Sequence, residues 1–163
     1  ESTINSYVVA YGLITLMMIV LLGNVKLGLI SMVPNVSPVL LGLSAMYLFQ
    51  MNLDLFTILI GAIAIGLAVD DTIHFMHNFQ RYHHETGDVD EAIVQTFLTT
   101  GRAMLITSLV LSLGFFVYLF SDMGNIFNFG AITGLVILTA LVADFILTPA
   151  ILKLSVADSK TKE

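Results

Sequence analysis

The chain has 163 residues, of which 57% are hydrophobic and 11% are charged. Because soluble domains carry about 25% charged residues, this composition excludes an ordinary soluble protein and predicts a membrane protein. The formal charge of −6 argues against a nucleic-acid partner, and the absence of cysteine excludes disulfides and thiolate metal sites.

Five apolar stretches follow one another along the chain, and each is long enough to cross a bilayer as a helix. We expect spans at about residues 4–23, 29–49, 54–82, 103–120 and 126–154. In the second span, Pro34 and Pro38 predict a bend or a late helix start near residues 33–37. The fold class that follows is an all-α membrane protein, a five-helix transmembrane bundle.

The polar segments between the spans indicate the orientation of the chain. Asp88 and Glu91 have the spacing of a capping box, which predicts an amphipathic cytoplasmic helix over about residues 89–100. If the spans alternate in direction, every positive residue falls on one side: Lys26, Arg81, Arg102, Lys153, Lys160 and Lys162. The positive-inside rule assigns that side to the cytoplasm, so the N-terminus is expected outside and the C-terminus inside.

The third span carries two adjacent carboxylates near its midpoint, Asp70 and Asp71. An ionised side chain at this depth costs about 2.5–3.5 kcal/mol, which marks such residues as functional by default. Because both carboxyl groups lie in a medium of low dielectric constant, they disfavour being ionised together, and the pair can load and unload protons as a coupled dyad. His74 lies one helical turn after Asp70 and can reach either carboxylate.

These positions predict a proton relay formed by Asp70, Asp71 and His74. Four further polar residues are expected to support the relay: His77 and Asn78 on the same helix, and Thr107 and Ser108 in the fourth span. The alternative for the two aspartates is that neighbouring hydroxyl groups cap them and that they only hold the bundle together. For His74 the alternative is a packing role, and Thr107 and Ser108 also suit hydrogen bonding between helices.

Other residues are assigned structural roles. Gly66, Gly130 and Gly134 are expected to let helices pack closely. For Asp144 in the fifth span, a hydrogen bond near the helix end is favoured over a proton role. His77, His83 and His84 lack a spaced carboxylate pattern, so no metal site and no cofactor are predicted.

Three motifs resemble those of the resistance-nodulation-division (RND) superfamily. They begin at Gly66 (GLAVDDTIHF), Gly101 (GRAMLITSL) and Ala143 (ADFILTPA), and the likeness covers nearly the whole chain. The resemblance implies two pseudo-repeats of six transmembrane helices, each with an extracytoplasmic domain inserted after its first helix. This chain is similar to helices two to six of one repeat, half of an RND-type transmembrane domain, and its charged tail suggests the C-terminal repeat. The chain begins at Glu1 without a basic leader, so we expect it to be part of a longer protein.

The resemblance also implies a function. Multidrug members are expected to pair the carboxylates with an intramembrane lysine, and no Lys or Arg lies at that depth here, which favours the predicted-exporter and lipid-transporter branch, related to Patched and sterol-sensing-domain proteins. The leading expectation is a proton-motive-force-driven exporter of a lipid, sterol or hopanoid-like molecule, located in a cell membrane such as the bacterial inner membrane. The alternative is a lipid-sensing or scaffolding module without transport.

The expected partners are membrane lipids, a lipophilic substrate, the other repeat, the extracytoplasmic domains and a second copy of the chain. No nucleophile elbow or phosphate-cradling loop is present. An enzyme is therefore not expected.

Overall fold

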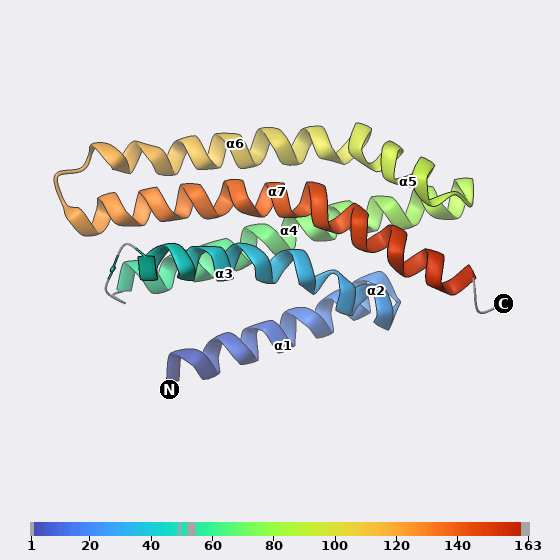
Figure 1. Ribbon diagram of the computed structural model, residues 1–163, viewed down its shortest axis with the longest axis horizontal. Coiled ribbons are helices and arrows are strands. Elements are labelled where there is room, and N and C mark those ends of the chain that lie inside the picture. The colour runs from blue at the N-terminus through green and yellow to red at the C-terminus, as the bar shows by residue number, and fades with distance from the viewer. Residues whose placement is uncertain (1, 49, 52–54, 161–163) are drawn as a thin grey trace.

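The computed structural model describes residues 2–48, 50–51 and 55–160. Its helices cross the molecule five times in alternating directions, and the C-terminus lies at the end where α1 turns into α2 and α4 turns into α5 (Figure 1). Five helical segments are long and apolar enough to span a membrane. The predicted all-α, five-helix transmembrane bundle is confirmed. Lys162 and the predicted span ends at residues 49 and 54 lie outside the described residues.

In chain order the helices are α1 (Ser2–Leu22), α2 (Val25–Ile30), α3 (Met32–Leu48), α4 (Leu55–Thr86), α5 (Val89–Thr96), the π-helical turn η1 (Phe97–Gly101), α6 (Arg102–Phe116), the 3₁₀ turn η2 (Val117–Phe120) and α7 (Gly124–Lys160).

The second span begins earlier than the sequence predicts, and the proline effect falls at a different place. Asn24 caps α2 by accepting a hydrogen bond from the Leu27 amide at 3.2 Å, so the new helix starts directly after the Gly23 turn. The break lies at Ser31, between α2 and α3. Pro34 has no N–H to donate to the carbonyl four residues back, at Ile30, which is where α2 ends.

The segment before the fourth span is a helix that continues into that span. α5 starts at Val89 with Asp88 as its N-cap, and then passes through η1 into α6 without an interruption of helical backbone. Figure 1 shows the bend where α5 meets α6. A π-helical turn widens a helix locally and can redirect it. The sequence pattern predicts two separate helices here, because a change of direction without a break in the helix leaves no cap residues to recognise.

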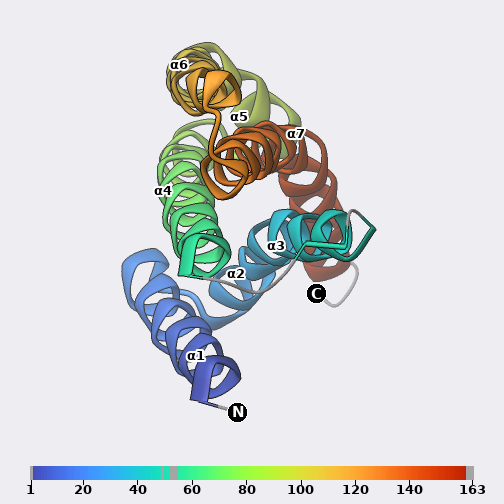
Figure 2. The same ribbon diagram turned by 90° about the vertical axis from the view of Figure 1, so that its left-hand side faces the viewer.

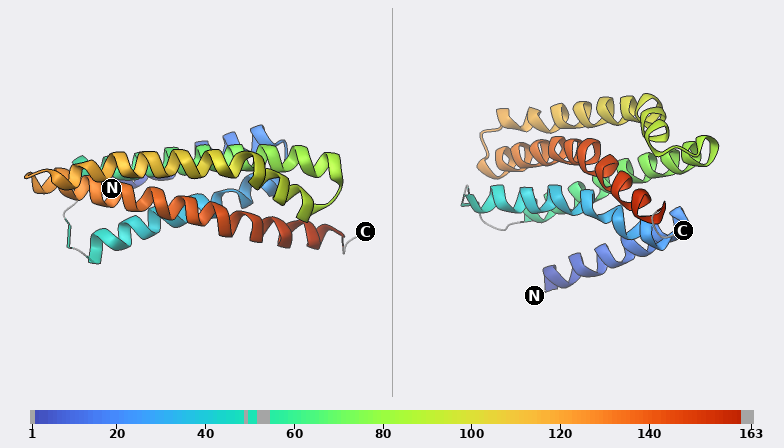
Figure 3. Two further views of the ribbon diagram at one scale, coloured as in Figure 1. Left: turned by 90° about the horizontal axis from the view of Figure 1, so that it is seen from above. Right: turned by 45° about the vertical axis from the view of Figure 1, so that its right-hand side comes forward.

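Helix α7 lies in the middle of the arrangement and packs against α3, α4 and α6. Figure 2, seen along the bundle, shows α1 outside this group, beside α2 and α4, and the right-hand view in Figure 3 agrees with this placement. Large apolar side chains such as Val20, Val110 and Leu113 are exposed on the outer surface. An apolar exterior suits contact with lipid chains or with other membrane helices.

Aromatic residues join α4, η1 and α7 near the end of the bundle that holds the C-terminus. The Phe97 ring packs edge to face against Phe75 and Phe145, with ring centroids 5.1 and 5.3 Å apart. Phe75 is fully buried. The π-helical turn is therefore held by direct ring contacts to both neighbouring helices.

Helix α7 approaches α6 and η2 closely at Gly130 and Gly134. A methyl group at Gly130 would lie 2.5 Å from the Phe115 carbonyl oxygen, and one at Gly134 would meet the Phe116 ring. Ser112 donates a hydrogen bond to the Gly134 carbonyl at 3.0 Å. Gly130 thus lies where two backbones approach each other, and Gly134 lies where an aromatic ring packs against α7.

Replacing Gly130 by alanine is expected to destabilise the protein by about 1–3 kcal/mol, because the added methyl group pushes α7 away from η2. Gly114→Ala is the matched control, since a methyl group there meets no atom within 4 Å. The thermal unfolding midpoint of both variants in detergent measures the difference. Equal midpoints would contradict the close approach.

Candidate functional site

The two adjacent carboxylates of α4 point in different directions, because successive residues on a helix are about 100° apart. Asp71 is half-buried toward α6 and accepts a hydrogen bond from the Ser108 hydroxyl at 3.1 Å. Asp70 lies on the exposed side of α4. The pair therefore has one carboxyl group inside the bundle and one on its surface.

A cavity of about 170 Å³ brings both carboxyl groups together with the fourth span. Its wall is formed by α4, α6 and α7, and its polar members are Asp70, Asp71, Thr107 and Ser108. A buried water needs room and two or more polar partners, and this cavity offers both. The arrangement can therefore hold a carboxyl dyad in contact with water at membrane depth.

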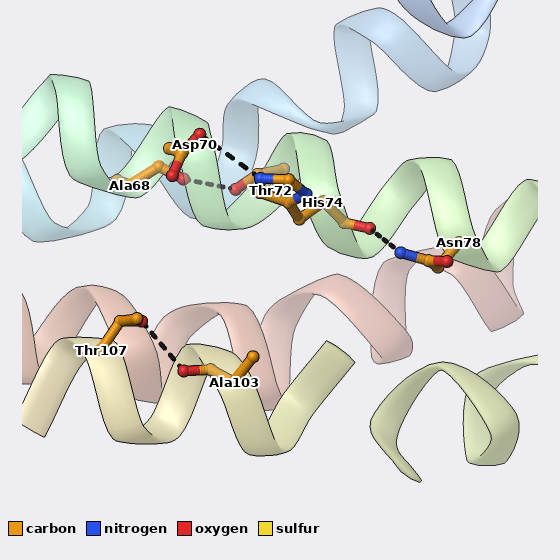
Figure 4. A network of polar contacts seen from close by, with 7 residues as sticks. All are labelled: Ala68, Asp70, Thr72, His74, Asn78, Ala103 and Thr107. Atoms are coloured by element: carbon orange, nitrogen blue, oxygen red, sulfur yellow. Dashed lines mark hydrogen bonds and ion pairs between the residues drawn. The ribbon is translucent and has the colours of Figure 1, made fainter. Parts of the chain in front are cut away.

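His74, the predicted third member of the proton relay, lies beside the outer carboxyl group, that of Asp70. Nε2 of His74 lies 3.7 Å from Oδ1 of Asp70, and their side chains are 63% and 67% exposed. Figure 4 shows this contact along α4. Both groups face outward in the described bundle, and the direct contact of His74 is with Asp70.

The other predicted support residues make local contacts. Asn78 donates to the carbonyl of His74 at 3.0 Å, and the Thr107 hydroxyl lies 3.0 Å from the Ala103 carbonyl (Figure 4). The Met104 carbonyl is also 3.0 Å from this hydroxyl. His77 is exposed. Of these residues Thr107 reaches the dyad through the shared cavity, whereas Asn78 and His77 lie further along α4.

Gly66 differs from the other two glycines. It is exposed, a methyl group there would meet no atom within 4 Å, and it lines an open cavity between α1 and α4. Its small size therefore serves no close contact between the described helices. Gly66 makes no close contact because its side of α4 faces the open cavity beside α1 and not the packed interface with α7.

A second polar cluster, which sequence reasoning missed, lies in the interior between α3, α4 and α7. Asp144 of α7 is 1% exposed, and its Oδ1 lies 2.8 Å from the Thr72 hydroxyl and 3.2 Å from the Thr148 hydroxyl. The Thr72 hydroxyl also lies 2.8 Å from Oδ1 of Asn35. The expected hydrogen bond of Asp144 is present, to Thr148 of its own helix and to Thr72 of α4. It lies within α7 and not near the end of that helix. An ionisable residue within an apolar span was the available signal.

Together these features define a multi-pass membrane protein with carboxyl groups at membrane depth. A model of the AcrB/AcrD/AcrF family matches residues 1–163. The chain belongs to this family, and thus to the RND superfamily, which confirms the resemblance seen in its motifs. The comparison thus shows a membrane segment of an RND-family protein.

Two curated relatives are similar over part of their length. A protein of Methanocaldococcus jannaschii, described as a membrane protein, is 29% identical over 152 residues, which are 91% of this chain and 39% of that protein. The hopanoid transporter HpnN of Rhodopseudomonas palustris is 28% identical over 103 residues, 63% of this chain and 12% of the transporter. The chain thus spans well under half the length of either relative. No solved structure matches.

Proposed function

We propose that this chain forms a membrane part of an exporter that uses the proton-motive force to move a lipophilic molecule, and that Asp70 and Asp71 carry the protons. The observation that supports this most is the cavity at membrane depth that both carboxyl groups share with Thr107 and Ser108. A proton crossing the membrane releases about 2.3 kcal/mol per 100 mV, which is comparable to the coupling free energy between two sites in an allosteric protein.

The exposure of polar side chains on α4 supports the presence of another membrane segment at this site. An ion pair such as Asp70 and His74 is costly when it faces lipid chains, yet both side chains are mostly exposed in the described bundle. We propose that another membrane segment covers them, either from the other repeat of an RND transporter or from a second copy of the chain. The covered face would then enclose the proton path on both sides.

A lipophilic substrate is supported by an apolar cavity of about 460 Å³ between α1, α3 and α4. Tyr7 and Tyr11 line it, and the buried Tyr11 hydroxyl has no hydrogen-bond partner within the described chain. A lipid fits such a site, because its chain or ring system would fill the apolar cavity. The name of the relative HpnN points to the same class of molecule, a hopanoid.

The same cavity favours a second candidate function, a lipid-sensing module that binds lipid without transport. The two candidates differ in what the carboxyl groups do. A sensor needs only the cavity, whereas an exporter also needs a carboxyl dyad that releases protons.

For the orientation we propose an extracytoplasmic N-terminus and a cytoplasmic C-terminus in a cell membrane, such as the bacterial inner membrane. Lys26 and Lys153 support it, because they lie at one end of the bundle: Lys26 donates to the Ser155 carbonyl at 2.7 Å, and Lys153 pairs with Asp90 at 2.5 Å. Positive residues gather on the cytoplasmic side of membrane proteins. The amphipathic α5 would then lie at the inner surface.

The experiment is transport of radiolabelled hopanoid or cholesterol by the intact protein reconstituted in liposomes with an imposed pH gradient. The exporter predicts movement that stops when a protonophore removes the gradient. Lipid that binds the protein but moves at the same rate with and without the gradient would favour the sensor.

A further inference from the structure

We propose that Asp144 is a proton-binding site separate from the Asp70 and Asp71 dyad, and that its bound proton joins α3 to α4 and α7. This site lies in the interior of the bundle, and its proton does not depend on which molecule is transported. Asn35, Thr72 and Asp144 have enough hydrogen atoms for their mutual hydrogen bonds only when Asp144 is protonated.

The orientation of the Asn35 amide is the first step. Asn35 is fully buried, and its Nδ2 lies 3.0 Å from the carbonyl oxygen of Ser31. A carbonyl oxygen only accepts hydrogen bonds, so the nitrogen of the amide must face Ser31. The amide oxygen, Oδ1, therefore faces the Thr72 hydroxyl at 2.8 Å and needs a hydrogen from it.

The second step concerns the single hydrogen of Thr72. Its Oγ1 lies within 2.8–2.9 Å of three acceptor atoms, which belong to Asn35, Asp144 and the Ala68 carbonyl (the contact to Ala68 is drawn in Figure 4). A threonine hydroxyl has one hydrogen to donate and two lone pairs with which to accept. If that hydrogen goes to Asn35, the hydrogen between Thr72 and Asp144 must come from Asp144.

The protonated cluster forms an unbroken chain across three helices. The carboxyl O–H of Asp144 on α7 donates to Thr72 on α4, and the Thr72 hydroxyl donates to Asn35 on α3. When the proton leaves, Thr72 has to turn its hydrogen toward the Asp144 carboxylate. The Asn35 oxygen then faces a lone pair of Thr72, and the bond that links α3 to α4 is lost. With the proton bound, hydrogen bonds join α7, α4 and α3. After its release, they join only α7 and α4.

The surroundings of Asp144 hold no compensating positive charge. Among the described residues no cation pairs with it, and α3 and η2 carry no charged side chain. Asp71 of α4 is a titratable group whose charge acts on Asp144, whereas Asp90 of α5 is paired with Lys153 and Arg102 of α6 is exposed. The separations of 2.8 Å between oxygen atoms are those of O–H···O hydrogen bonds. They favour a proton over a sodium ion, which would have to sit between the oxygen atoms and push them apart.

Infrared spectroscopy of the intact protein in lipid tests the proposal without any transport assay. A protonated carboxyl group gives a C=O stretching band that is separate from those of carboxylates. We expect such a band at pH 7 in the Asp70→Asn, Asp71→Asn double variant, where the dyad contributes none. It should move when aspartate is labelled with ¹³C, and it should be lost when Asp144→Asn is added. The amide of Asp144→Asn can still donate to Thr72, so the cluster keeps its contacts.

Thr72→Val provides the second variant, because it removes the acceptor of the Asp144 proton while keeping the side-chain shape. The band is expected to shift to higher frequency. Thr133→Val should leave it unchanged, since the buried Thr133 donates to the Phe129 carbonyl of its own helix and to no other group among the described residues. Absence of the band in the Asp70→Asn, Asp71→Asn double variant, its survival when Asp144→Asn is added, or its loss on adding sodium at constant pH would each overturn the proposal.

Discussion

Asp71→Asn is expected to reduce export driven by a pH gradient to the level of liposomes without protein. Asparagine has the shape of aspartate and its oxygen can still accept the hydrogen bond from Ser108, which is 3.1 Å long in the wild-type protein. The fold should therefore persist. The amide cannot bind or release a proton, so the link between the gradient and the movement of helices is removed. Flux of labelled hopanoid or cholesterol in proteoliposomes measures the loss.

The control for this prediction is Asp122→Asn, which makes the same change of charge in the exposed turn between η2 and α7. We expect it to leave the flux unchanged. Asp70→Asn is expected to lower the flux as strongly as Asp71→Asn, because the two groups share one cavity. Normal gradient-driven flux in both variants would favour the capping role for the aspartates.

Phe75→Ala is expected to cause the largest loss of stability among single substitutions in the interior, about 2–3 kcal/mol. The ring is fully buried and packs against Phe97 at a centroid distance of 5.1 Å. Large-to-small changes of phenylalanine in soluble cores cost about 3–5 kcal/mol. The expected value is lower here because lipid chains are as apolar as the side-chain interior, so that mainly packing is lost.

Phe120→Ala is the matched control for this substitution, since Phe120 is 89% exposed. It removes the same atoms from a position at the end of the fourth span that has few neighbours. Unfolding of both variants in mixed micelles by a denaturing detergent gives the difference in free energy. A loss for Phe120→Ala as large as that for Phe75→Ala would show that the aromatic cluster adds nothing beyond the contact with lipid.

Most of the fold follows from the sequence, because the bilayer restricts what an apolar segment can do. A stretch such as residues 126–154 can satisfy its backbone only as a helix, and short polar turns force neighbouring spans to run in opposite directions. Local departures from regular α-helix are harder to predict from the sequence. The π-helical turn at Phe97–Gly101 has no residue signature of its own and depends on the ring contacts that Phe97 makes with two other helices.

The candidate site shows the same division. Asp70, Asp71 and His74 stand out because charged residues are rare in apolar spans and because their spacing on one helix can be counted. The cluster around Asp144 depends instead on how α3, α4 and α7 pack. Asn35 and Thr72 lie 37 positions apart, and Thr72 and Asp144 lie 72 positions apart, so no spacing rule within one helix could have joined them.

The most direct test of the proton-coupling claim follows the pH inside liposomes that contain the intact protein and a trapped fluorescent pH indicator. Addition of a labelled lipid substrate in the absence of any pH gradient should change the internal pH as the substrate moves, in proportion to the amount transported. In the Asp70→Asn, Asp71→Asn double variant this pH change should vanish. Substrate movement in the wild-type protein with no change of internal pH, or an equal change in the double variant, would contradict the account.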